Sequence, residues 1–262
     1  MSGETIHTLA RSAPTGAGYE IAVRHLPGGP PGVLWLGGFN SDMAGTKAVA
    51  LAEWGARTGR AVTRFDYMGH GESTGRFEDG TIGLWLADAR AAFERFCTDR
   101  TVLVGSSMGG WIALLLARDL RRTAPDLAAR IAGMVLIAPA TDFTERLMWA
   151  RFPPEVRTIL EREGVWHRPS EYGDPYPITR ALIEEGRSHL LFDDGEIETG
   201  CPVHILQGVA DEDVPWQHAV DLVSHLTRDD VVLTLVKDGD HRLSREEDIA
   251  RLIAAVEGIT RD

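Results

Sequence analysis

The sequence predicts an α/β fold: a mostly parallel, eight-stranded sheet with helices on both faces and one helical insertion. Two observations support this prediction. Short apolar segments alternate with amphipathic helical patterns along most of the chain, and one long interval without a strand pattern interrupts them. With 262 residues, 44% of them hydrophobic and 25% charged, the chain has the size and composition of a single domain, residues 1–262.

The first half of the chain is expected to supply five strands. Two lie at an edge on either side of a turn-rich segment, and the third is a short apolar run typical of a buried parallel strand. This run ends at the glycine pair Gly37-Gly38. In chain order the predicted strands are 4–10, 19–25, 33–36, 61–66 and 101–104.

Helical patterns separate these strands and continue after them. The segment 81–97 is the clearest, because its apolar residues repeat at spacings of three and four and so share one helical face. The other predicted elements are helices 44–58 and 108–121, strand 134–138, strand 202–206, helix 216–227, strand 231–236 and helix 245–257.

The interval 143–200 departs from this alternation. It contains no convincing strand pattern, and it carries Trp149, Phe152, Trp166, Tyr172, Tyr176 and Phe192 among its aromatic residues. A plain loop in a compact domain rarely exceeds about 15 residues, so the interval is too long and too aromatic for a loop. We interpret it as a helical lid inserted between two core strands; a surface excursion with a small core of its own is compatible with the same pattern.

Charge and cysteine content narrow the class of protein. The formal net charge of −12 argues against nucleic acid or an anionic membrane surface as a partner, because both would be repelled. Cys97 and Cys201 are too few for a disulfide scaffold and lack the spacing of a metal site.

The N-terminus has neither the basic start nor the apolar run of a secretory signal, and no window approaches the roughly 20 apolar residues of a membrane span. The expected location is the cytoplasm.

The strongest functional pattern is Gly105-Ser106-Ser107-Met108-Gly109, a G-x-S-x-G motif between an apolar strand and a helix. A nucleophile raised above a sheet needs a sharp, strained turn, and glycine two positions to either side avoids a collision within that turn. The N-terminal amides of the following helix point to where negative charge develops. The motif predicts an α/β-hydrolase fold with Ser107 as the nucleophile; Ser106 is a competing candidate at the middle x position.

A general base and an orienting acid occur in the order typical of this fold, in which the acid precedes the histidine. Asp211 follows the predicted strand 202–206, and His241 follows strand 231–236. Because the carboxyl ends of parallel strands lie at one edge of a sheet, both loops are expected beside Ser107. We therefore predict that His241 is the general base and that Asp211 orients it.

Other acidic residues fit the orienting role less well. Asp142 follows strand 134–138 and is the alternative acid, since some α/β-hydrolases draw their acid from that strand. Asp213 fits a cap for the helix after it. Asp238 and Asp240 lie too close to His241 in the chain to orient its ring.

The other histidines considered are assigned non-catalytic positions. His70 lies in a loop common in this fold and is expected to be structural. His204 alternates into a strand, which predicts a hydrogen-bonded core histidine. His218 and His225 lie on helix 216–227 and are expected at the surface.

Two backbone amides are predicted to form an oxyanion hole, which requires donors about 3 Å from the developing charge. One is the N–H of Met108, directly after the nucleophile. The other is the N–H of Phe39, because the Gly37-Gly38 pair lets this loop approach a substrate; the N–H of Asn40 is the alternative. Acyl transfer by these groups requires no metal and no cofactor.

Several motifs from about Gly32 onward carry a family resemblance. They are GFNSDM at 38–43, GTKA at 45–48, RFDY at 64–67 with Gly69, LVGSSMGGW at 103–111, GVW at 164–166, Pro169-Ser170 with Tyr172, DVPW at 213–216 and DHR at 240–242. Together they resemble the α/β-hydrolase domain-containing protein 10 family, the mitochondrial palmitoyl-protein thioesterases of animals. The resemblance implies cleavage of S-acylated protein thioesters and of acyl glucuronides, with Ser107, Asp211 and His241 as the triad. The chain begins without an Arg-rich, acid-poor transit segment, which favours a bacterial relative.

Three functions are compatible with these patterns. The first is a serine hydrolase for small-molecule acyl esters or thioesters or for S-acylated protein. The second is a C–C bond hydrolase with the same triad, although none of the lid arginines Arg151, Arg157 and Arg162 singles it out. The third is a non-catalytic binding module, which is disfavoured because such proteins usually lose a triad member. The oligomeric state is not predicted.

Overall fold

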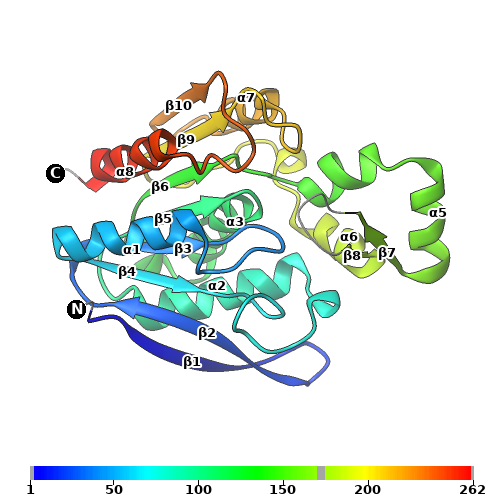
Figure 1. Cartoon of the computed structure of the whole chain (residues 1–262), viewed down its shortest axis with the longest axis horizontal. Coiled ribbons are helices and arrows are strands. Elements are labelled where there is room, and N and C mark those ends of the chain that lie inside the picture. The colour runs from blue at the N-terminus through cyan, green and yellow to red at the C-terminus, as the bar shows by residue number, and fades with distance from the viewer. Residues whose placement is uncertain (1–2, 170–174, 261–262) are drawn as a thin grey trace.

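An eight-stranded sheet forms the centre of the computed structural model (Figure 1). The structure describes residues 3–169 and 175–260. β1 and β2 pair antiparallel, as do β2 and β4, and all other neighbouring pairs of the sheet are parallel. The predicted mostly parallel, eight-stranded sheet is therefore confirmed. In sheet order the strands are β1 (Thr5–Ser12), β2 (Gly18–Leu26), β4 (Arg60–Phe65), β3 (Gly29–Leu36), β5 (Thr101–Ser106), β6 (Ile131–Ile137), β9 (Val203–Gly208) and β10 (Val231–Val236).

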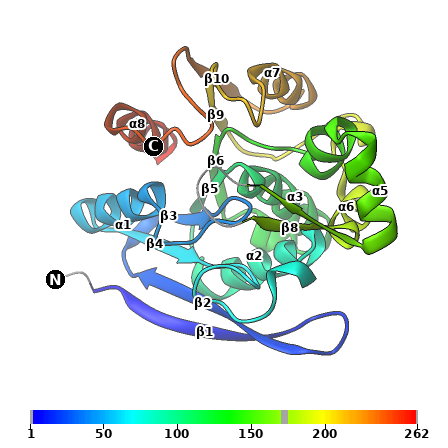
Figure 2. The ribbon, with the colours of Figure 1, turned by 45° about the vertical axis from the view of Figure 1, so that its right-hand side comes forward.

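Helices cover both faces of the sheet (Figure 2). Successive residues of a strand point to opposite faces, so Leu34 joins the core beneath α2, α3 and α7, while Trp35 joins the core beneath α1 and α8. A sheet buried on both faces must be apolar on both, which explains the continuous apolar strands of the sequence. The helices are α1 (Thr46–Thr58), α2 (Ile82–Phe96), α3 (Met108–Thr123), α4 (Pro125–Ala128), α7 (Trp216–His225) and α8 (Glu246–Thr260).

Both cysteines are free and buried. Burial raises the pKa of the Cys97 thiol to about 12 and that of Cys201 to about 11. A thiol with such a pKa carries almost no thiolate at neutral pH, so neither residue is a candidate nucleophile.

The chain between β6 and β9 forms an insert at the end of the sheet (Figure 1). It contains α5 (Pro154–Glu163), α6 (Arg180–Gly186) and several short helical turns, together with two strands that the sequence did not predict, β7 (Val165–Arg168) and β8 (Tyr176–Thr179). The expectation of no strand was wrong because these four-residue strands pair only with each other, antiparallel, and show no extended alternation. Ser170 and Tyr172, named above for the family resemblance, lie outside the described residues.

Candidate active site

Ser107 lies on the sharp turn between β5 and α3. Its φ of 54° and ψ of −117° are unfavourable for a residue with a side chain, so the surrounding structure must impose this conformation. Hydrogen bonds on both sides do so: the N–H of Ser107 donates to the carbonyl of Ile137 (2.8 Å), and the N–H groups of Gly110 and Ala140 donate to the carbonyl of Ser107 (2.9 and 3.1 Å). Neighbouring strand β6 thus anchors the turn.

Both glycines of the motif are required by backbone packing. A Cβ at Gly109 would lie 2.0 Å from the carbonyl oxygen of Leu36, and a Cβ at Gly105 would lie 2.3 Å from the carbonyl oxygen of Gly109. Main-chain atoms at these distances cannot move aside as a flexible side chain can. The absence of side chains at 105 and 109 is therefore a condition for the turn that presents Ser107.

We expect Gly109→Ala to lower the free energy of unfolding by about 1–3 kcal/mol or more, because the new methyl group overlaps strand β3. Gly258→Ala is the matched control, since Gly258 is exposed in α8 with no atom within 4 Å of its ideal Cβ. A glycine-to-alanine change within a helix should raise stability by about 0.5–1 kcal/mol. Urea unfolding followed by circular dichroism measures both changes, and equal effects of the two substitutions would contradict the packing argument.

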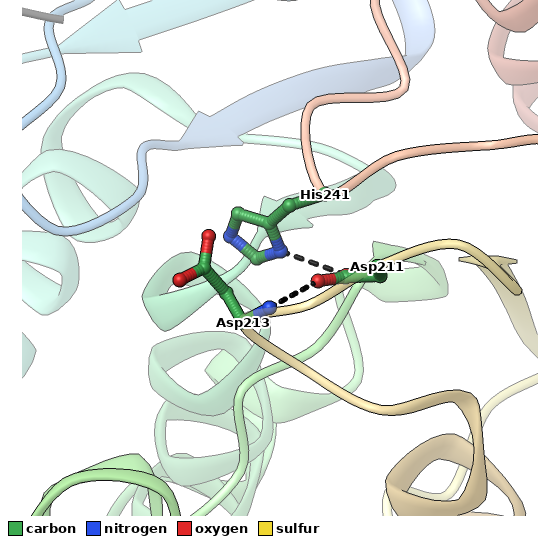
Figure 3. A group of neighbouring side chains, drawn as sticks. All are labelled: Asp211, Asp213 and His241. Carbon is green, nitrogen blue, oxygen red and sulfur yellow. Dashed lines mark hydrogen bonds and ion pairs between the residues drawn. The ribbon is translucent and has the colours of Figure 1, made fainter. Parts of the chain in front are cut away.

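The structure brings the side chains of Ser107, His241 and Asp211 together, although they are far apart in the chain. His241 Nε2 lies 3.1 Å from Ser107 Oγ, and His241 Nδ1 lies 2.8 Å from Asp211 Oδ2. Figure 3 shows His241 and Asp211 facing each other from two different loops. The loops follow β10 and β9, so parallel strands place both of them at the same edge of the sheet as the Ser107 turn.

The carboxylate of Asp211 is completely buried and fully hydrogen-bonded. Oδ1 accepts from the N–H groups of Asp213 (2.9 Å) and Val214 (2.8 Å), and Oδ2 accepts from Gln207 Nε2 (3.1 Å) and from His241. Sequence reasoning missed Gln207. The available signal was a polar residue directly after the predicted strand 202–206, four residues before Asp211. These contacts hold the carboxylate in one orientation toward the imidazole.

Asp142, the alternative acid, has a different role in the structure. Its buried carboxylate accepts hydrogen bonds from the N–H groups of Leu191 (2.8 Å) and Phe192 (3.0 Å), near the other end of the insert. Arg146 lies 3.7 Å away. Asp142 therefore ties the two ends of the insert together, and His241 is not among its partners.

The other acidic residues named from the sequence make different contacts. Asp238 pairs with Arg245 (2.7 Å), and Asp240 accepts from the N–H of Leu243 (2.9 Å). Asp213 is not the cap expected for α7, because Pro215 occupies that position without a side-chain cap.

Asp211, Asp213 and His241 also place three possible metal-ligand atoms within 4.8 Å of one another. Figure 3 shows the carboxylate of Asp213 pointing away from that of Asp211. Both oxygens of Asp211 already accept hydrogen bonds, so a cation there would have to displace one of four donors. We therefore interpret the group as part of the serine–histidine–aspartate arrangement.

The loop after β3 supplies the second candidate oxyanion donor. It passes close to the nucleophile: a Cβ at Gly38 would lie 3.4 Å from Ser107 Cβ. The alternative donor, the N–H of Asn40, is directed to His70 Nε2 at 3.3 Å. The amides of Phe39 and Met108 have no hydrogen-bond partner among the described residues, and Met108 opens α3, where amides have no partner within the helix. The geometry thus favours Phe39 over Asn40.

His70 is structural, as the sequence predicted. Its ring is buried, lies against Trp85 and places Nδ1 3.2 Å from the carbonyl of Met68. Burial lowers the pKa of His70 to about 4. The neutral ring donates from Nδ1 to Met68 and accepts at Nε2 from Asn40, which ties the loop after β3 to the loop after β4.

We expect the free energy of unfolding to fall by about 2–3 kcal/mol between pH 7 and pH 4.5 through His70 alone. The sign follows from a folded-state pKa of about 4, below the ordinary value of 6.5, since the unfolded chain binds the proton first as the pH falls. His70→Gln should remove this part of the loss. Urea unfolding at both pH values measures it, and an unchanged pH dependence in the variant would contradict the assignment. His25, His204 and His218, whose pKa values burial also lowers, contribute equally in both proteins.

The surface position expected for His218 was wrong. His218 is buried, its Nε2 lies 2.7 Å from the carbonyl of Thr141, and its ring contacts Phe192. His225 is half-buried and stacks on the same ring. The insert covers this side of α7, which the helical pattern alone does not reveal. His204 is hydrogen-bonded to Thr234 (2.9 Å), as predicted, but it is half-buried rather than a core residue.

The insert reaches both sides of the Ser107 site. Arg168 at the end of β7 lies 3.7 Å from the carboxylate of Asp213, in the loop after β9. Tyr176 at the start of β8 packs against Phe39, in the loop after β3, with ring centroids 5.9 Å apart. The Phe39 ring also contacts other aromatic rings, those of Phe77, Trp85 and Phe143. The paired strands β7 and β8 therefore connect the two loops that flank the nucleophile.

The sheet topology and the serine turn define the class to which this chain belongs: it is an α/β-hydrolase. More narrowly, it belongs to the hydrolase family described as serine aminopeptidase, S33. The model of that family matches residues 33–184 of this chain. Palmitoyl-protein thioesterase ABHD10, mitochondrial, from Bos taurus is 33% identical over 242 residues, which are 92% of this chain and 76% of the relative. The predicted resemblance to this group of α/β-hydrolases is confirmed.

Solved structures agree with this assignment. Alpha/beta hydrolase domain-containing protein 10 from mouse has a TM-score of 0.84 and 32% identity, with 97% of this chain and 98% of that chain covered. The crystal structure of an Agrobacterium vitis S4 protein has a TM-score of 0.91 and 46% identity, with 98% and 100% covered. None of the helices in the described part of this chain combines the length and apolar character that a membrane crossing requires.

Proposed function

We propose that this hydrolase cleaves carboxylic esters or thioesters through an acyl-enzyme on Ser107, with His241 as general base and Asp211 as the orienting acid. The observation that carries the proposal is the continuous set of contacts from Asp211 Oδ2 through His241 to Ser107 Oγ. A buried carboxylate that accepts from Nδ1–H leaves Nε2 unprotonated and directed at the serine hydroxyl.

The acylation step follows from these positions. Ser107 Oγ forms a bond to the acyl carbon as its proton passes to His241 Nε2, and the acyl oxygen becomes an oxyanion. The amides of Phe39 and Met108 donate hydrogen bonds to that oxyanion, at the N-terminal end of α3. When the intermediate collapses, the bond to the alcohol or thiol breaks, and the leaving group takes the proton from His241.

Deacylation repeats the sequence with water. Water gives a proton to His241 Nε2 and bonds to the acyl carbon, and Ser107 Oγ then leaves with that proton. The products are a carboxylic acid and free enzyme. No step of this scheme requires a metal or a cofactor.

The proposed substrates are acyl esters or thioesters, including S-acylated protein. Two facts support this class: the relatives named as palmitoyl-protein thioesterases, and the aromatic rings that surround Phe39 beside the candidate oxyanion amides. The insert would act as a lid over the acyl group, since it contributes Tyr176 to those rings. The cytoplasmic location expected from the sequence stays a prediction, because the animal relatives are named as mitochondrial proteins.

Hydrolysis of matched oxoesters and thioesters from two to sixteen carbons tests the proposal, with a fluorophosphonate probe reporting on the nucleophile. We expect turnover that increases with acyl length and covalent labelling at Ser107. Labelling without turnover of either series would retain the nucleophile and reject the substrate class, and C–C bond hydrolysis would be tested next. Absence of both labelling and turnover would favour a non-catalytic binding module.

A further inference from the structure

Lys47 is an unusual residue in this chain. Lysine and arginine together number 27, but only Lys47 and Lys237 are lysines. Lys237 is exposed, whereas Lys47 is half-buried in the first turn of α1, within the GTKA motif at 45–48. The positive end of a helix dipole disfavours a cation in that turn. A lysine in this position therefore needs a compensating contact.

The compensating contacts lie in the loop that carries the candidate base. Lys47 Nζ donates a hydrogen bond to the carbonyl oxygen of Arg242, the residue directly after His241, and lies 3.4 Å from Ser244 Oγ. Ser244 Oγ itself donates to the same Arg242 carbonyl at 3.0 Å. Two donors thus converge on one main-chain oxygen beside His241, and one of them comes from the opposite end of the chain.

The backbone of this loop requires such support. Leu243 is buried and has a φ of +43°, a left-handed conformation that is costly for a residue with a side chain. Its N–H is held by Asp240 Oδ1 (2.9 Å). The turn from Asp240 to Leu243 is therefore fixed on one side by its own aspartate and on the other by Lys47.

The cavity next to Lys47 is lined mostly by apolar side chains. Lys47, Leu206, Leu243 and Leu252 are among the residues that line a cavity of about 10 Å³ beneath the turn. Burial there, together with the smaller effect of the Arg242 charge, lowers the pKa of Lys47 to about 8, while Asp240 and Asp248 oppose the shift. Arg251 of α8 also faces this cavity.

We propose that Lys47 is a positioning residue that holds the His241 turn, and with it the imidazole, in place for proton transfer to and from Ser107. The inference rests on the proposed function of His241. Lys47 touches neither the substrate nor the reacting atoms; it acts through the carbonyl of Arg242. Because His241 Nε2 lies 3.1 Å from Ser107 Oγ, a small displacement of the turn lengthens the contact through which the proton moves.

The test compares Lys47→Met with Lys237→Met, the other lysine of the chain. We expect Lys47→Met to lower kcat by about 10-fold to 100-fold with KM changed less than about twofold, since the binding surface is untouched. Its thermal stability should be unchanged or raised, because methionine replaces a half-buried charge with an apolar chain of similar shape. Lys237→Met should match the wild type in both measurements.

The pH profile distinguishes positioning from a general effect of packing. In the wild type, kcat should decrease a few-fold as the pH rises through about 8, because the neutral amine makes a weaker hydrogen bond than the ammonium. Lys47→Arg keeps a charge at every pH used and should restore kcat near neutral pH while removing this decrease. Carbon-13 labelling of the lysine side chains lets the titration of Lys47 be followed directly. Two lysine signals are expected, and the one missing in Lys47→Met belongs to Lys47.

Fluorophosphonate labelling separates failure of this inference from failure of the proposed function. A wild-type protein that neither labels nor turns over an ester would reject the proposed function. A wild type that does both, with Lys47→Met equal to it in kcat and pH profile, would overturn the positioning role alone. If Lys47→Met does not fold, Lys47→Arg decides: an alkaline decrease like that of the wild type would overturn the proposal, and its disappearance would support it.

Discussion

Replacement of Ser107 by alanine is expected to lower kcat by a factor on the order of 10⁶ while leaving the fold intact, as when one member of a cooperating triad is removed. The side chain of Ser107 contributes Oγ to His241, whereas the main chain supplies the hydrogen bonds that maintain the turn. Alanine tolerates the φ of 54° about as well as serine does. Steady-state hydrolysis of the best acyl ester or thioester measures the loss.

Ser106→Ala is the matched control, because Ser106 is the adjacent serine of the same motif and lies at the end of strand β5. It should stay within a few-fold of the wild type. His241→Ala should lose about as much activity as Ser107→Ala, and the double variant hardly more, since the two groups act in one proton transfer. Full activity in Ser107→Ala, or additive losses in the double variant, would contradict the assignment.

Asp211→Asn is expected to reduce kcat by about 10⁴-fold. The side-chain amide of asparagine can donate a hydrogen bond to His241 Nδ1, where the carboxylate accepts one. It therefore favours the imidazole tautomer with its proton on Nε2, directed at Ser107. That tautomer cannot remove the serine proton. The amide would also face Gln207 Nε2, which donates to the carboxylate in the native chain.

Asp142→Asn separates the two candidate acids. It should leave kcat within a few-fold of the wild type and instead lower the free energy of unfolding by about 1–3 kcal/mol, because one of the two buried amides of Leu191 and Phe192 loses its acceptor. Kinetics and urea unfolding of both variants give the comparison. A large loss of kcat in Asp142→Asn with little loss in Asp211→Asn would move the orienting role to the strand before the insert.

Much of the candidate site was predictable because it depends on short-range patterns. The strand and helix around Ser107 are read from local apolar periodicity, and the glycines at 105 and 109 follow from the sharpness of one turn. Gln207 and Lys47 were not predictable in this way. Their partners are the Asp211 carboxylate and the Arg242 carbonyl, and no periodic pattern indicates where a single side chain will find an acceptor.

The misplaced residues have a common physical cause. His218 was expected at the surface because it lies on a helix, but the insert folds back and buries it against Phe192. The strands β7 and β8 were missed because each is four residues long and is stabilised by the other rather than by an apolar alternation. Both features depend on contacts between segments far apart in the chain.

By itself, the sequence determined the chain order of the strands of the main sheet and of the helices between them, the turn at Ser107 and the loops that hold Asp211 and His241, since periodicity, glycine spacing and position after a strand are local properties. The tertiary structure decided which carboxylate contacts the imidazole and what supports the His241 turn. It also decided that the N–H of Asn40, next to Phe39, already donates a hydrogen bond to His70. Those outcomes depend on distances of about 3 Å between atoms on different elements. Such distances are set only when the sheet, its helices and the insert pack together.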